Sequence, residues 1–236
     1  MLDLPLLPVD EKWVAEYEAL TAGNEWLRRK VGRDRRINEQ GQYLLDNVPE
    51  VLGMDEEDLH VVDLGCGPGE LLEIARHYRF KPYGVDAQSG AGGMGDDYLR
   101  VAALMCSRQA IPTYRFGYDA WLNSGFPKAL TGKVALINSR GSWEQMHAAL
   151  MDGTPHDQHH RADRMTWRLG PSLETYAMKE MATLRACLHP RGVLLIHGNG
   201  AVNHADYAKV LLHAANAAGL ENVVANGHVF KWKVRN

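Results

Sequence analysis

Apolar and polar residues alternate along the chain with two different periods from His60 onward. Short apolar runs are separated by longer segments whose apolar residues recur every three or four positions, which is typical of amphipathic helices. The predicted strands cover residues 60–64, 82–85, 113–116, 134–137 and 193–197. The predicted helices cover residues 70–78, 97–108, 142–151, 173–188 and 204–218. Because strands that alternate with helices form right-handed crossovers, this pattern predicts a parallel sheet.

The end of the chain departs from this alternation. Two β-prone runs, 220–225 and 228–234, are separated by Asn226-Gly227. Asn-Gly is the strongest short-range hairpin signal, because the tight turn needs positive φ at both central positions. The predicted fold class is therefore α/β, with a doubly wound, mostly parallel seven-stranded sheet that ends in an antiparallel hairpin.

The first 50 residues lie outside the strand and helix alternation. Apolar residues at mixed three- and four-residue steps, among them Trp13, Tyr17 and Leu20, predict helical structure. A second helix is predicted over 37–47 and ends before Pro49. We therefore expect residues 1–50 to form an N-terminal helical cap and residues 51–236 to form the main domain.

Composition and charge narrow the class of protein. With 45% hydrophobic and 23% charged residues, the chain of 236 residues has the composition of a soluble globular protein. Its net charge of −3 provides no overall basic field for nucleic acid or an acidic membrane. The three cysteines form no CxxC pair, and no basic-apolar leader or run of ~20 apolar residues is present. We expect a cytoplasmic protein.

A glycine-rich loop follows the first predicted strand. Gly65, Gly67 and Gly69 stand at alternate positions, directly before a predicted helix, where they allow a tight turn with its backbone close to a ligand. The spacing is GxGxG and differs from the GxGxxG of dinucleotide-binding proteins. Asp63 precedes the first glycine by two residues, and its carboxylate suits an ammonium group and would repel a pyrophosphate.

The next two predicted strands also lead to acidic residues. Asp86 follows the second strand, where a carboxylate can accept hydrogen bonds from both hydroxyls of a ribose. Asp119 follows the third strand beside the aromatic residues Phe116, Tyr118 and Trp121, an arrangement that can bind an adenine amino group and flank its ring. A purely structural explanation remains, in which the glycines make a tight turn and the acids cap helices.

Residues 60–120 resemble the class I S-adenosylmethionine-dependent methyltransferases, and the terminal hairpin is similar to the last two strands of that fold. The resemblance implies that Asp63 and the three loop glycines line the methionine part of the cofactor, that Asp86 holds the ribose and that Asp119 meets the adenine. It further implies a cofactor-binding role for four residues, Cys66, Ala87, Tyr118 and Asn138. Residues 51–236 would then be the cofactor-binding domain, covered on the substrate side by the cap.

The segment after the fourth strand bears on the methyl acceptor. Asn138 is not followed by the Pro-Pro-aromatic pattern of enzymes that methylate exocyclic amines of bases, and no cysteine follows a proline as in cytosine-5 enzymes. Nucleic-acid acceptors are therefore disfavoured. Arg140 is a candidate for binding an anionic acceptor, with a solvent-exposed loop arginine as the alternative.

Histidines supply candidates for a general base. His197 ends the fifth predicted strand and precedes glycines that leave it uncovered, although a histidine satisfied by backbone hydrogen bonds explains the position equally well. His156, His159 and His160 lie near two aspartates, but their spacing matches no specific metal site, so we expect no metal there. His159 is kept as a second candidate base.

The pattern as a whole predicts methyl transfer from S-adenosylmethionine to a hydroxyl oxygen of a small molecule or a sugar or glycan precursor, with a histidine base and without a membrane partner. Two alternatives stay open. The basic cluster within residues 28–36 would suit an RNA or protein methyltransferase, and a non-catalytic cofactor-binding partner subunit would have the same fold. A homodimer is compatible with each.

Overall fold

The structure is a computed structural model. It describes residues 15, 19, 22–23, 33–86, 95–108, 110–115, 118–143, 147, 171–198, 205–226 and 229–235. Among the described residues, no helix is both long and apolar enough to cross a membrane.

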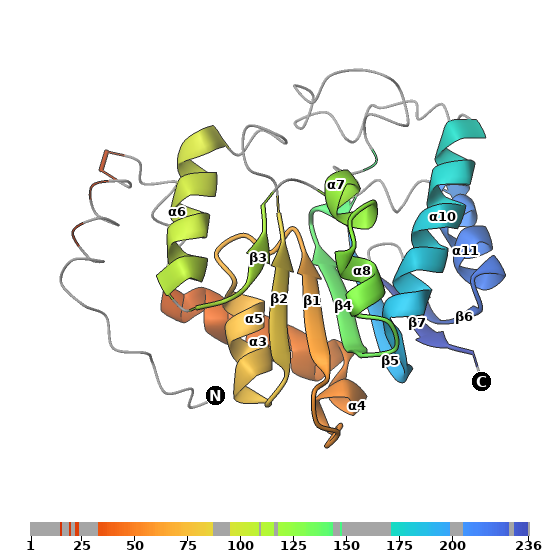
Figure 1. Ribbon diagram of the computed structural model, residues 1–236, viewed down its shortest axis with the longest axis horizontal. Coiled ribbons are helices and arrows are strands. Elements are labelled where there is room, and N and C mark those ends of the chain that lie inside the picture. Colours follow the sequence, from red (N-terminus) through yellow and green to blue (C-terminus); the bar gives the residue numbers. More distant parts are fainter. Residues whose placement is uncertain are drawn as a thin grey trace.

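The centre of the molecule is a seven-stranded sheet with the order β3-β2-β1-β4-β5-β7-β6 (Figure 1). Its strands are β1 (His60–Leu64), β2 (Lys81–Val85), β3 (Thr113–Tyr114), β4 (Val134–Arg140), β5 (Leu188–His197), β6 (Leu220–Asn226) and β7 (Val229–Val234). Strands β1 to β5 pair in parallel, whereas β7 runs antiparallel to both β5 and β6. The predicted fold class, including the terminal antiparallel hairpin, is confirmed.

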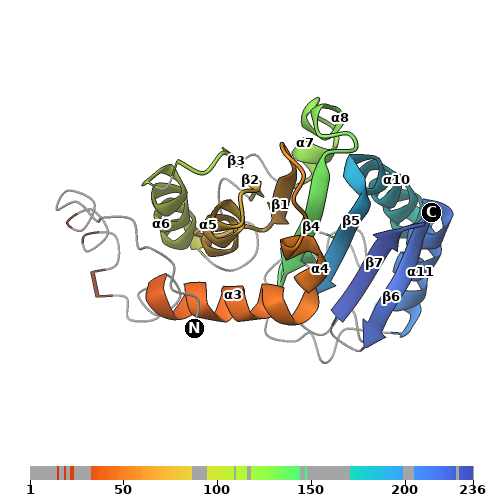
Figure 2. The same ribbon diagram turned by 90° about the horizontal axis from the view of Figure 1, so that it is seen from below.

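Helices cover both faces of the sheet (Figures 1 and 2). One face carries α3 (Arg33–Asn47), α4 (Pro49–Leu52), α5 (Glu70–His77) and α6 (Gly95–Arg108). The other face carries α7 (Tyr118–Leu122), α8 (Phe126–Ala129), α10 (Pro171–Cys187) and α11 (Ala205–Ala217). The sheet is therefore doubly wound, and its carboxyl ends meet at one edge, where ligands of such folds bind.

Successive residues of a strand point to opposite faces, so β1 contributes to two separate cores. Val62 and Leu64 pack in the core beneath α10 and α11, whereas Val61 packs in the core beneath α3 and α5. The latter core also contains Tyr43 and Leu44 of α3. Asp63 alternates with Val62 and Leu64, and it therefore lies on the α3 face of the sheet.

Several element boundaries differ from the prediction. Strand β4 continues through Asn138-Ser139 to Arg140, because β5 pairs with it as far as His197 and satisfies its backbone. The predicted hairpin turn is displaced by one residue: a register shift between Asn222 and Val224 lengthens β6, and Asn226 pairs with Val229. Strand β3 has two residues, and position 116 lies outside the described residues.

Helix α3 begins at Arg33, four residues before the predicted start, and packs against α5. Tyr43 and Leu44 are 7% and 1% exposed, because they fill the space between α3 and the sheet. Of the predicted helix over 142–151, only Trp143 and His147 are described in helical conformation. The domain boundary at residue 50 stays a prediction.

Candidate active site

The glycine loop joins β1 to α5 with three residues in the left-handed region. Gly65, Gly67 and Gly69 have φ values of +79°, +49° and +85°, a backbone conformation that residues other than glycine rarely adopt. The amide groups of Gly65 and Cys66 both donate to the carbonyl of Val85, at 2.7 and 3.2 Å. The loop is thereby fixed to the end of β2, next to Asp86.

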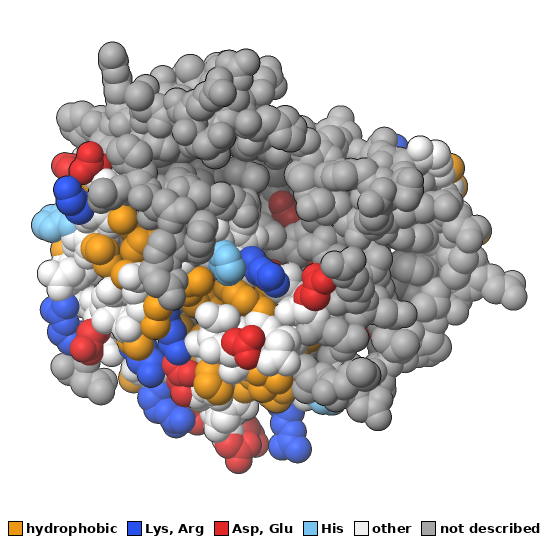
Figure 3. All heavy atoms as spheres, turned by 180° about the vertical axis from the view of Figure 1, so that it is seen from behind, with side chains coloured by type: hydrophobic (Ala, Val, Ile, Leu, Met, Phe, Trp, Pro, Cys, Tyr) orange, Lys and Arg blue, Asp and Glu red, His pale blue; other side chains and the backbone are white. Residues whose placement is uncertain are grey.

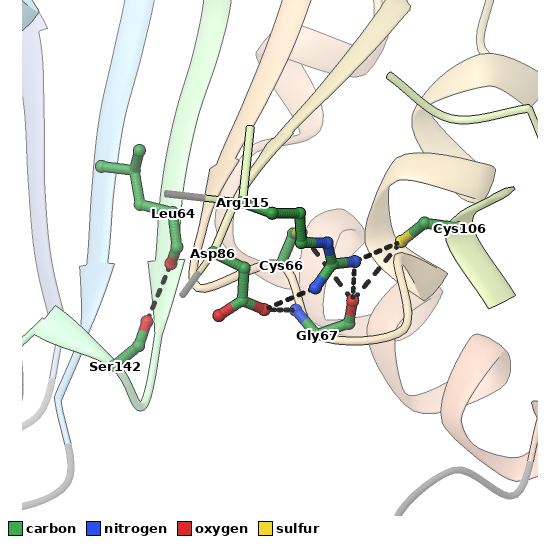
Figure 4. Close-up of polar contacts among 7 residues, drawn as sticks. All are labelled: Leu64, Cys66, Gly67, Asp86, Cys106, Arg115 and Ser142. Carbon is green, nitrogen blue, oxygen red and sulfur yellow. Dashed lines mark hydrogen bonds and ion pairs between the residues drawn. The ribbon is translucent and has the colours of Figure 1, made fainter. Parts of the chain in front are cut away.

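Ser142 explains why position 65 has no side chain. Its hydroxyl donates to the carbonyl of Leu64 at 2.8 Å (Figure 4), and it also lies 3.0 Å from the hydroxyl of Ser139. A Cβ atom at Gly65 would lie 2.1 Å from the Ser142 Oγ and 2.4 Å from its Cβ. The segment after β4 therefore packs directly on the glycine loop, a contact that the loop's spacing does not predict.

Asp86 and Arg115 hold the middle of the glycine loop from two sides (Figure 4). The amide of Gly67 donates to Asp86 Oδ2 at 2.7 Å, and Arg115 Nη1 lies 3.5 Å from the same oxygen. Arg115 Nη2 also donates to the carbonyl of Gly67 at 3.3 Å. Both side chains are about 15% exposed, so this ion pair is largely shielded from water. Arg115 was missed by sequence reasoning, although a basic residue directly after β3 was a usable signal.

Two thiols complete this arrangement around the Gly67 carbonyl. Cys106 of α6 and Cys66 of the loop approach the carbonyl oxygen at 3.4 and 3.8 Å, and Arg115 Nη2 donates to the Cys106 sulfur at 3.2 Å. The interaction between the two cysteine side chains raises the pKa of Cys66 and lowers that of Cys106, and the Arg115 guanidinium favours the Cys106 thiolate further. Cys106 is consequently the more acidic of the two thiols.

Asp63 is a buried carboxylate at the end of β1. It is 6% exposed and accepts a hydrogen bond from Asn138 Nδ2 at 2.7 Å, while Asn138 Oδ1 accepts one from the Tyr43 hydroxyl at 3.3 Å. Burial raises the pKa of Asp63 to about 7, although the Asn138 hydrogen bond opposes the shift. No described basic side chain forms an ion pair with Asp63, so the site retains an acidic group that a ligand cation can neutralise.

Arg140 and His197 come together at the ends of β4 and β5, where they are partners in the strand register. Both adjoin the ring of Tyr43: the Arg140 Cζ atom lies 4.5 Å and the centre of the His197 ring 5.8 Å from its centroid. Arg140 Nη1 also donates to Gln40 Oε1 at 3.0 Å. Tyr43, which the sequence did not single out, thus connects these candidates through Asn138 to Asp63.

The residues proposed for the adenine region occupy different environments. Tyr118 is 8% exposed, and its ring centroid lies 6.0 Å from those of Trp121 and Trp143 in the core. Asp119 is exposed at the start of α7 and accepts a hydrogen bond from the Tyr176 hydroxyl. Ala87 and the three histidines at 156, 159 and 160 lie outside the described residues.

A second polar cluster, missed by sequence reasoning, is buried between α10 and α11. His147 Nδ1 lies 2.6 Å from the Tyr207 hydroxyl, and its Nε2 lies 3.0 Å from Glu180 Oε1. All three side chains are at most 1% exposed. Because water has no access to this cluster, we interpret it as the polar connection that fixes the segment after β4 to the two helices.

The chain matches the model of a family described as methyltransferase domain over residues 33–213. It belongs to this methyltransferase family. Among solved structures, the methyltransferase is similar to the antibiotic-resistance methyltransferase Kmr, with 14% identity, coverage of 80% of this chain and 91% of that chain, and a TM-score of 0.46. It is also similar to a TehB-like SAM-dependent methyltransferase from Corynebacterium glutamicum, with 14% identity, coverage of 89% and 98%, and a TM-score of 0.46. No curated protein matches the sequence.

As a member of this family, the protein is an S-adenosylmethionine-dependent methyltransferase, and its candidate site fits that cofactor. Gly67 and Gly69 carry no side chains and adopt left-handed backbone conformations in the loop, and the buried Asp63 lacks a cationic partner among the described residues. Asp86 supplies a second carboxylate at the end of the next strand. An ammonium group and a sugar with two hydroxyls are the chemical complements of these two acids.

Proposed function

We propose that the methyltransferase transfers the methyl group to a hydroxyl oxygen of a small molecule or a sugar or glycan precursor, with a histidine as general base. The observation that carries the proposal is the position of His197. Its ring adjoins Tyr43, whose hydroxyl is linked through Asn138 to Asp63. The candidate base and the candidate cofactor acid therefore belong to one connected set of side chains on the α3 face.

In this proposal, the cofactor lies across the carboxyl ends of β1, β2 and β4. Asp63 pairs with its ammonium group, Asp86 binds its ribose and Asp119 meets its adenine. The remaining lining positions are Gly65, Cys66, Gly67, Gly69, Ala87, Tyr118 and Asn138. When bound, S-adenosylmethionine supplies an electrophilic methyl group on a positively charged sulfur.

His197 would accept the proton of the acceptor hydroxyl, whose oxygen would receive the methyl group that the cofactor supplies. A positioned base of this kind contributes on the order of 10²–10⁴ in rate. Arg140, beside it in the strand register, orients the acceptor. His159 is the second candidate base. Residues 1–50 form the cap that covers the acceptor. The protein acts in the cytoplasm, and a homodimer is compatible with this function.

The experiment begins with calorimetric titration of the protein with S-adenosylhomocysteine, followed by a screen of sugars and small phenols with labelled S-adenosylmethionine. His197→Asn should retain cofactor affinity and lose on the order of 10²–10⁴ in kcat on the best acceptor. His213→Asn, on α11 at the far face, is the matched control. Transfer of label to a nitrogen atom, to RNA or to protein would show that the proposed acceptor is wrong. Full activity of His197→Asn would show that His197 is not the base.

A further inference from the structure

The end of β4 presents a fixed and exposed guanidinium group at the carboxyl edge of the sheet. Arg140 is the last residue of β4 and lies two positions beyond Asn138, which hydrogen-bonds Asp63. Residues two apart in a strand are separated by about 7 Å, a distance that a small acceptor can span. Arg140 and Asn138 also point to the same face, so the guanidinium stands close to the cofactor acid.

The position of Arg140 is fixed before any ligand arrives. Its guanidinium lies 4.5 Å from the Tyr43 ring centroid, and one nitrogen donates to Gln40. Tyr43 is 7% exposed and is held in turn by Asn138. A stacked guanidinium on an immobile ring loses little further freedom when it binds a ligand.

No described carboxylate forms an ion pair with Arg140. Its hydrogen-bond acceptor among the described residues is the neutral amide of Gln40. A guanidinium has five N–H donors, which match the paired oxygens of a carboxylate or a phosphate. On the described part of this face, Figure 3 shows a histidine side chain beside a basic side chain.

We propose that Arg140 on Tyr43 is an oxyanion subsite, and that the acceptor is an anion whose carboxylate or phosphate binds there while its hydroxyl faces His197. The inference rests on the proposed function for the identity of the acceptor hydroxyl. It goes beyond that function in naming the charge of the acceptor and the residue that selects it. A structural arginine that only attaches α3 to the sheet would stabilise the fold without selecting anions.

The test compares charged and neutral members of matched probe pairs on the complex with S-adenosylhomocysteine. The probes are 4-hydroxybenzoate against 4-hydroxybenzamide, and glucose 6-phosphate against glucose. We expect at least one anion to bind about 10- to 100-fold more tightly than its neutral partner, the range typical of a charged hydrogen-bonded contact. The anion that binds with the higher affinity shows whether the subsite prefers a carboxylate or a phosphate.

Variants then assign the preference to this side chain. Arg140→Gln should abolish it, Arg140→Lys should retain part of it, and Tyr43→Phe should preserve it because the ring remains. Arg191→Gln is the matched control, since Arg191 lies at the start of β5 and pairs with Glu56. A far-UV circular dichroism spectrum that matches the wild type shows that each variant is folded.

The outcomes separate this inference from the proposed function. An anion preference that Arg140→Gln removes, without methyl transfer to oxygen, supports the subsite and overturns O-methylation. O-methylation of neutral acceptors that Arg140→Gln leaves unchanged overturns the subsite alone. Equal binding of both members of every pair, or no binding by any probe, also overturns the subsite.

Discussion

Asp63 is the group whose ionisation we expect to control cofactor affinity. Burial raises its pKa from 3.8 to about 7, and the negative charges of Asp86 and Glu70 act in the same direction. The Asn138 hydrogen bond and the positive charge of Arg140 oppose the shift without cancelling it. Near neutral pH the free protein therefore contains a mixture of protonated and ionised Asp63, whereas a ligand ammonium group pairs with the ionised form.

The size of the effect follows from the pKa. The ionised fraction of a group with a pKa near 7 rises about eightfold between pH 6 and pH 7.5, and the affinity for S-adenosylhomocysteine should rise by the same factor. Stability should change in the opposite direction. Because the folded state retains the proton that the unfolded chain releases above its pKa of 3.8, stability of the free protein falls as pH rises from about 4 to about 7, by at most about 4 kcal/mol.

Asp63→Asn tests both consequences. The amide has the same shape and does not ionise, so the variant should lose the pH dependence of affinity and bind about 10- to 100-fold more weakly at pH 7.5. It should also remove the fall in urea midpoint between pH 5 and pH 7. Asp58→Asn is the control, because Asp58 is exposed before β1 and its pKa is lowered by Lys81. An affinity that is constant between pH 6 and pH 7.5 in the wild-type protein would refute the reasoning.

Three further predictions concern the glycine loop. Asp86→Ala should weaken S-adenosylmethionine binding by about 1–3 kcal/mol in calorimetry, through loss of charge-assisted hydrogen bonds. Arg115→Met should weaken it by about tenfold, because the Gly67 carbonyl loses a hydrogen-bond donor and Asp86 loses its ion-pair partner, whereas Arg76→Met at the surface should have no effect. Gly65→Ala should lower the free energy of unfolding by about 2–5 kcal/mol in urea titration, from the left-handed φ and overpacking together. Equal affinities for the Arg115 and Arg76 variants would contradict the second prediction.

The sequence predicts the fold because its local signals agree with one another. Strand and helix periods alternate through the main domain, and Asn226-Gly227 marks the antiparallel end of the sheet. Asp63 lies near the carboxyl end of β1 and Asp86 directly follows β2, and parallel strands bring their carboxyl ends to one edge. These residues could be placed near one another from topology alone, without knowledge of any side-chain contact.

Other parts of the site depend on packing between distant segments, which no local pattern records. Tyr43 reaches Asn138 because α3 crosses the sheet, and the two residues are 95 positions apart. Arg115 meets Gly67 because β3 lies beside β2 and is only two residues long. A helical periodicity shows that Tyr43 faces a core, but it does not show which strand end that core covers.

The glycine at position 65 has two possible physical reasons, and the sequence alone does not distinguish them. The glycine pattern suggests close approach of a cofactor, whereas the structure places the Ser142 side chain where a Cβ atom of residue 65 would lie. The double variant Gly65→Ala with Ser142→Gly separates them, because it removes the clash and leaves the positive φ. Stability should recover to within about 1–2 kcal/mol of the wild type, the cost of the left-handed conformation. If cofactor affinity stays low while stability recovers, position 65 must be glycine for the ligand as well. If both recover, Ser142 alone accounts for the glycine at this position.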